Sequence, residues 1–161
     1  MDPNNQIVEN NARGGTDQPH RILIADDNQA NCELLEAYLM QSAYTIDFAK
    51  DGAETMEKAK SFAPDLILLD VMMPKLNGFE VCQQIKSDPT LRRIMILMVT
   101  ALNELGDIER AVNAGTNDFL SKPVKKLELI KRVENLLALK GVHDENERLR
   151  QYIQNMEASR T

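Results

Sequence analysis

The sequence predicts an α/β fold in which a five-stranded parallel sheet is covered by helices on both faces, a doubly wound arrangement. From His20 onward, short apolar runs alternate five times with helix-length amphipathic segments, a pattern typical of such sheets. The runs at 65–70 and 94–99 are almost continuously apolar, as expected of central strands that are buried on both faces. Pro64, Pro89 and Gly115 fall at the joins where helices should stop.

Each element can be assigned in chain order. The expected strands are RILIAD at 21–26, YTIDFA at 44–49, DLILLD at 65–70, IMILMVT at 94–100 and DFLS at 118–121. The second strand alternates apolar with polar residues, which indicates a more peripheral place in the sheet. The expected helices lie between the strands, near 29–42, 52–62, 78–87 and 105–114, and a last helix runs from Val124 to Leu139.

Composition divides the 161 residues into one domain and two ends. Residues 1–20 are polar and carry two prolines, so we expect a disordered tail that cannot offset its ordering entropy. A folded domain is expected over 21–140 and a helical extension over 141–161.

The net charge of −6 disfavours direct nucleic-acid binding. No apolar stretch predicts a membrane span or a signal peptide, and Cys32 and Cys82 lack metal-ligand spacing, so a cytoplasmic protein is expected.

Polar residues stand where the expected strands end. Asp26 and Asp27 close the first strand, Asp70 the third and Thr100 the fourth, and Lys122 follows the fifth. In a parallel sheet these ends meet at one edge, where ligands bind. Each residue alone could equally be a turn residue or a helix N-cap, but five together favour a shared site.

Three carboxylates at such an edge require a counter-charge. At about 5 Å and an effective dielectric constant of about 20, each pair of carboxylates costs about 3 kcal/mol. Mg²⁺ is the cation that suits these oxygen ligands. A carboxylate neutralised by Mg²⁺ beside a lysine is also a suitable acceptor for a phosphoryl group.

Four motifs, in their order and spacing, resemble the receiver domain of two-component response regulators. They are ILIADDN at 22–28, DLILLDVMMPKLNG at 65–78, VTA at 99–101 and SKP at 121–123. The resemblance covers 21–140, about three quarters of the chain. It implies a flavodoxin-like fold with strand order 2-1-3-4-5. It also implies a signalling receiver, not an enzyme, which catalyses only its own phosphoryl transfer and dephosphorylation.

The resemblance assigns the phosphorylation site and the cofactor. Asp70 resembles the phosphoacceptor, which takes its phosphoryl group from a sensor histidine kinase or a phosphotransfer protein. Asp26 and Asp27 resemble the acidic pair that holds Mg²⁺, completed by Asp70 and the backbone carbonyl of Met72.

The resemblance also assigns the residues that respond to phosphorylation. Lys122 would contact the phosphoryl oxygens, and Pro123 would follow a cis peptide bond that aims it. Thr100 resembles the switch hydroxyl, and Phe119 occupies the aromatic switch position. Without the resemblance, Phe119 would be assigned to the core. Such a receiver switches its conformation or dimerisation to control a partner or an output domain.

The C-terminal extension has a heptad pattern. Positions a and d hold Leu139, Val142, Asn146, Leu149, Ile153 and Met156. An Asn at position a favours a parallel two-stranded coiled coil, with Glu145 at g facing Arg150 at e across a homodimer. Two and a half heptads are short for a coiled coil, and Gly141 costs the helix about 1 kcal/mol. A solvated helical tail or a linker is the alternative.

Other classes of function fit less well. A phosphatase or phosphotransferase with an Asp nucleophile usually shows an Asp-x-Asp arrangement and a cap domain, whereas Asp26 and Asp27 are adjacent and no insertion could form a cap. An adaptor that has lost phosphorylation is disfavoured because every acidic and switch position is filled. Whether the chain is complete or precedes an output domain, such as a cyclic-di-GMP enzyme, stays open.

Overall fold

The computed structural model describes residues 18–101 and 105–159, and in that part the predicted fold is confirmed. Its five parallel strands have the order β2-β1-β3-β4-β5. Their bounds are β1 (Arg21–Ala25), β2 (Thr45–Ala49), β3 (Leu66–Leu69), β4 (Met95–Thr100) and β5 (Asp118–Ser121). The strands agree with the sequence prediction to within a residue at each end. The tail predicted over 1–20 lies outside the described residues, except for 18–20.

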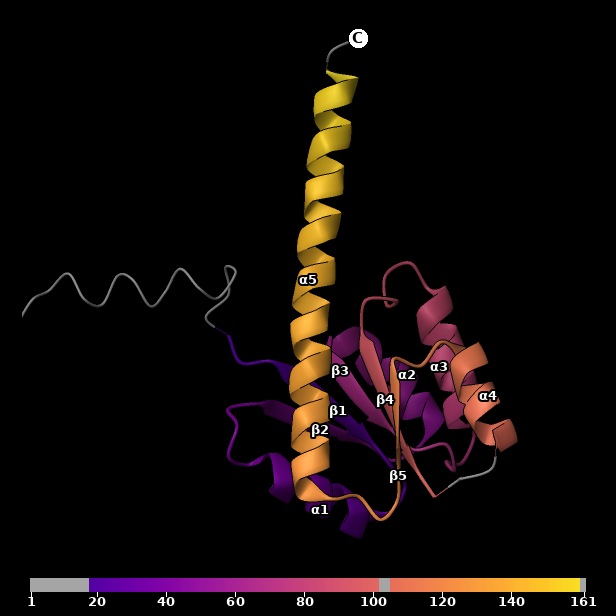
Figure 1. Ribbon diagram of the computed structural model, residues 1–161. Helices are drawn as coiled ribbons and strands as arrows, with labels where there is room; N and C mark the ends of the chain where they lie inside the picture. The colour runs from indigo at the N-terminus through magenta and orange to yellow at the C-terminus, as the bar shows by residue number, and fades with distance from the viewer. Residues whose placement is uncertain (1–17, 102–104, 160–161) are drawn as a thin grey trace, which may run out of the picture.

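Five helices connect and follow the strands (Figure 1). They are α1 (Gln29–Leu39), α2 (Gly52–Ser61), α3 (Gly78–Ser87), α4 (Leu105–Ala114) and α5 (Lys126–Ala158). Three of them begin at a side chain that accepts a hydrogen bond from the backbone N–H three residues later, namely Asn28, Asp51 and Asn77. These N-caps satisfy amide groups that the first helical turn leaves free.

The sheet divides the core into two layers. Alternate residues of a strand face opposite sides, so Leu23 and Ile67 pack on the side of α2, α3 and α4. Ile24 and Leu68 pack on the side of α1 and α5. All residues of β3 and β4 are buried, which confirms their central position.

Helix α5 joins the last predicted helix and the C-terminal extension into one continuous helix of 33 residues. Its first half packs on the sheet through Leu129, Val133, Leu136 and Leu137. Its distal half, residues 141–158, projects beyond the sheet (Figure 1). Within the described chain, no helix is long and apolar enough to cross a membrane.

Gly141 lies inside this helix without interrupting it. A Cβ added at Gly141 would meet no atom within 4 Å, so a side chain has room. We expect Gly141→Ala to raise the free energy of unfolding by about 1 kcal/mol, because Ala loses less backbone entropy in a helix. Urea unfolding followed by circular dichroism measures this change. A lower free energy of unfolding for the variant would contradict this expectation.

Candidate functional site

The sheet brings the sequence-predicted acidic residues together at the carboxyl ends of its strands. Asp26 and Asp27 directly follow β1, and Asp70 directly follows β3. Each offers one carboxylate oxygen, and these oxygens lie within 4.8 Å of one another. Asp26 and Asp70 are buried, whereas Asp27 is exposed. The cluster therefore has a fixed inner part and a side that faces solvent.

Lys122, which follows β5, bridges the two buried carboxylates. Its Nζ lies 3.1 Å from Oδ2 of Asp26 and 3.1 Å from Oδ2 of Asp70. Backbone N–H groups hold the other oxygens: Asn28 donates to Oδ1 of Asp26 (2.9 Å) and Met72 donates to Oδ1 of Asp70 (3.2 Å). Both carboxylates are therefore oriented from two sides.

The titration behaviour of the site reflects this arrangement. Burial raises the pKa of Asp70 above its usual value, and the Met72 N–H and the Lys122 charge oppose that rise. Burial lowers the pKa of Lys122, but its hydrogen bond to Asp26 and the charge of Asp70 outweigh burial, so this pKa is raised. Lys122 therefore stays cationic beside carboxylates whose mutual repulsion one lysine offsets only in part.

The loop that carries Asp70 passes very close to the start of α3. A Cβ added at Gly78 would collide with the carbonyl oxygen of Asp70 and lie 2.7 Å from Cα of Val71. The Gly78 N–H also donates to the Val71 carbonyl (3.0 Å). Only glycine allows this approach, so Gly78 helps to place the Asp70 backbone.

The remaining predicted residues lie in, or shortly after, strands β3, β4 and β5. Thr100 ends β4 and is fully buried, and its carbonyl accepts the Lys122 backbone N–H (2.8 Å). Phe119 in β5 is partly buried against the core layer of α2, α3 and α4. The Lys122–Pro123 peptide bond is cis. The Met72 side chain is exposed, and its backbone N–H contacts Asp70.

Sequence reasoning missed Asn28. Its N–H holds Asp26 and its side chain caps α1, so it couples the acidic pair to the helix that follows. The available signal was its place directly after the pair, where an N-cap residue is expected.

The Thr100 hydroxyl has no hydrogen-bond partner in the described part of the chain. A buried, unpaired polar group costs about 1–3 kcal/mol. We therefore expect Thr100→Val, which keeps the shape and removes the hydroxyl, to raise the free energy of unfolding by about 1 kcal/mol. Chemical denaturation of the unphosphorylated protein measures this difference. A loss of stability would mean that the hydroxyl is already paired.

The donor set fits a hard divalent cation. Three carboxylates supply oxygen atoms only, and Asp27 keeps its side of the cluster open to solvent. Such a set matches Mg²⁺, which prefers a few carboxylates and retains several waters. An acidic cluster that is compatible with Mg²⁺ thus lies at the ligand-binding edge of the sheet.

Comparisons with known proteins identify the class of domain. The family model described as "Response regulator receiver domain" matches residues 22–134. The chain is 45% identical over 125 residues to the response regulator PleD of Caulobacter vibrioides, covering 78% of this chain and 28% of PleD. It is 39% identical over 117 residues to the DNA-binding dual master transcriptional regulator RpaA of Synechocystis, covering 73% of this chain and 48% of RpaA.

A solved structure agrees. The receiver domain of sensor histidine kinase PA1611 from Pseudomonas aeruginosa, with a magnesium ion in its active site cleft, superposes with a TM-score of 0.69. It is 31% identical, and the match covers 75% of this chain and 99% of that one.

The fold and the family match thus define a signalling receiver domain of the doubly wound type. The chain belongs to the response regulator receiver domain family, whose members are phosphorylated on an aspartate by sensor kinases. It spans less than a third of PleD and about half of RpaA.

Proposed function

We propose that this chain accepts a phosphoryl group on Asp70 from a sensor histidine kinase or a phosphotransfer protein. By changing its conformation or dimerisation, it then controls a partner or an output domain. The observation that carries this proposal is the Lys122 ammonium, held 3.1 Å from both Asp26 and Asp70. It places a positive charge where the incoming phosphoryl oxygens would gather.

Mg²⁺ belongs to this proposal as the cofactor. Asp26, Asp27, Asp70 and the backbone carbonyl of Met72 would hold it. The compact carboxylate cluster and the magnesium ion in the PA1611 receiver support that assignment. When bound, Mg²⁺ supplies positive charge that stabilises the transferring phosphoryl group.

The chain's own residues then have distinct tasks in the transfer. A carboxylate oxygen of Asp70 forms the new O–P bond while the P–N bond of the donor phosphohistidine breaks. The Met72 N–H fixes the second carboxylate oxygen and so orients the attacking one. Lys122 offsets the charge on the phosphoryl oxygens. In its ionised form Asp70 gives up no proton as it attacks, and the donor leaves as a neutral imidazole when its other ring nitrogen carries a proton.

We assign the response to Thr100 and Phe119. The Thr100 hydroxyl lacks a partner within the described residues, so a phosphoryl oxygen would satisfy it. A rotation of Thr100 would leave space into which Phe119 turns from its partly buried position. Shifting a population from 1% to 99% active needs about 5.5 kcal/mol, which these contacts and that of Lys122 must supply together.

The test uses acetyl phosphate as the phosphoryl donor. We expect intact mass spectrometry to detect one phosphoryl group per chain in the presence of Mg²⁺ and none in the presence of EDTA. Hydroxylamine should remove the adduct, since it cleaves acyl phosphates. No adduct under any condition would favour an adaptor without phosphorylation.

The domain borders and the dimer belong to the same proposal. We place the receiver domain at 21–140 and the helical extension at 141–161. Support for a parallel homodimer comes from α5, whose apolar heptad residues are 44–55% exposed: Leu139, Val142, Leu149, Ile153 and Met156. The Asn146 side chain is also exposed on this helix. A second α5 helix would cover this stripe.

We expect beryllofluoride, a phosphoryl mimic, to shift the chain to a dimer in light scattering, and Ile153→Asp to keep it monomeric. A charge at position a would be buried in the coil without a partner. Arg148→Asp, at the outward position c, is the matched control and should still dimerise. A wild-type monomer with and without beryllofluoride would contradict the dimer.

Two expectations about location and partners complete the proposal. The free cysteines Cys32 and Cys82 support a reducing, cytoplasmic setting. RpaA is described as DNA-binding, but the match spans only about half of it. The net charge of −6 supports a receiver that makes no direct contact with nucleic acid.

A further inference from the structure

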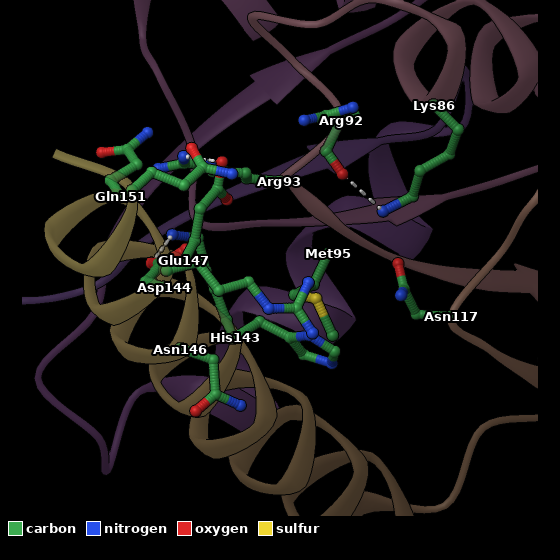
Figure 2. Close-up of a pocket in the computed structure, with 13 residues that line it drawn as sticks. Lys86, Arg92, Arg93, Met95, Asn117, His143, Asp144, Asn146, Glu147 and Gln151 are labelled. Atoms are coloured by element: carbon green, nitrogen blue, oxygen red, sulfur yellow. Dashed lines mark hydrogen bonds and ion pairs between the residues drawn. The ribbon is translucent and has the colours of Figure 1, made fainter. Parts of the chain in front are cut away.

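A second concave site lies at the amino ends of the strands, away from the acidic cluster. It is a cleft of about 650 Å³ between the distal half of α5, the end of α3 and the loop before β4. Figure 2 shows Lys86 and Arg92 on one side, and His143, Glu147 and Gln151 of α5 on the other. Met95, the first residue of β4, also lines the cleft. This volume is within the range of small-molecule sites.

The cleft is strongly cationic although the whole chain carries a net charge of −6. Its lining has two carboxylates and five cations: Asp144, Glu147, Lys86, Arg92, Arg93, Lys140 and Arg150. Charge of one sign gathered in a concave site concentrates counter-ions and raises their association rate. The cleft is therefore electrostatically suited to an anion.

Ion pairs among the described residues use two of these cations. Arg93 bonds to Glu147 (2.6 Å), and Lys140 to Asp144 (2.8 Å) and Asp65 (3.7 Å). In the described chain, no carboxylate pairs with the other three, which are Lys86, Arg92 and Arg150. Within a single chain, these three remain available to a ligand.

Lys86 is held as a fixed charge on the wall of the cleft. Its Nζ donates to the backbone carbonyls of Ile94 (2.6 Å) and Arg92 (3.2 Å). Its stem lies beneath Gly115, whose φ of +91° is in the left-handed region and whose added Cβ would come within 3.1 Å of Cγ of Lys86. Burial lowers the pKa of this ammonium, so a nearby anion would compensate a partly desolvated charge.

The chemistry of the lining selects among anions. Arg92 and Arg150 present guanidinium groups, which match phosphate oxygens in a two-pronged geometry. Side-chain amides of Asn117, Gln151 and Gln154 supply further hydrogen-bonding groups. Three available cations around one space suit a ligand with several negative charges.

We propose that this cleft binds a phosphate-bearing small molecule of nucleotide size, which joins the domain to the distal half of α5. The ligand's phosphate oxygens would contact Arg92, Arg150 and Lys86, which come from three different segments of the chain. The inference does not rest on phosphorylation of Asp70, because the two sites lie at opposite ends of the strands.

Isothermal titration calorimetry of the full chain tests this proposal, with inorganic phosphate, pyrophosphate and ATP as probes. EDTA is present so that no metal-mediated binding occurs at the acidic cluster. We expect one molecule of pyrophosphate or ATP to bind per chain. Arg92→Ala should weaken that binding about tenfold or more, since it removes a charge-assisted hydrogen bond. Tighter binding of ATP than of pyrophosphate supports a nucleotide, and equal binding supports recognition of the phosphate chain alone.

The matched control is Arg148→Ala. Arg148 is an exposed residue of α5 that does not line the cleft, so the variant should bind pyrophosphate or ATP with unchanged affinity. Arg92 is exposed, so thermal unfolding should confirm that its variant is folded. Arg92 also lies outside the α5 heptad, which keeps this test separate from dimerisation. The proposal is overturned if no phosphate probe saturates or if Arg148→Ala weakens binding equally. The proposal also fails if the chain binds a short polyglutamate peptide but none of the phosphate probes.

Discussion

Replacing Asp70 with Asn is expected to abolish the phosphoryl adduct formed with acetyl phosphate and Mg²⁺. Asparagine keeps the size of the side chain, but its amide lacks the negative charge and the nucleophilic carboxylate oxygen that forms the O–P bond. Intact mass spectrometry reads the result directly as the presence or absence of one phosphoryl group.

Two observations make this result interpretable. Burial raises the pKa of Asp70, so removing its charge relieves a desolvated carboxylate, and we expect the variant to stay folded by circular dichroism. The matched control is Asp47→Asn. Asp47 lies on β2 and pairs with Lys58 of α2, so its replacement should not affect the adduct. If the Asp70→Asn variant still carried one phosphoryl group per chain, the phosphoacceptor would be another residue.

The second large effect concerns the sheet itself. Leu68 is 1% exposed and lies between Ile24 and Leu97 in the register of β3 with its neighbours. Leu68→Ala is expected to lower the free energy of unfolding by about 2–5 kcal/mol, because it removes buried methyl groups and leaves a cavity. Chemical denaturation monitored by circular dichroism measures the loss.

Leu127→Ala serves as the comparison, since Leu127 is 72% exposed. The same chemical change there should alter stability by less than about 0.5 kcal/mol. Similar losses for the two variants would mean that the central strand packs less tightly than its burial indicates.

The strands and the acidic cluster were predictable because local signals define them. Each strand is an apolar run, and the Asp or Lys residues that follow three of them meet wherever parallel strands end. The unpaired Thr100 hydroxyl was not predictable, since it depends on the packing of every neighbouring side chain. The cationic cleft was also hidden, because Arg150 is far in sequence from Lys86 and Arg92 and lines a cleft with them only after α5 packs on the sheet.

The length of α5 would turn a small movement of the domain into a larger one at the end of the helix. A helix rises about 1.5 Å per residue, so the distal half of α5 is about 25 Å long. A tilt of about 10° where its first half packs on the sheet would displace the far end by about 4 Å. Because the helix is continuous across Gly141, it would act as a lever arm. A rearrangement around β5 could thereby be read at a distance by whatever adjoins the end of the helix.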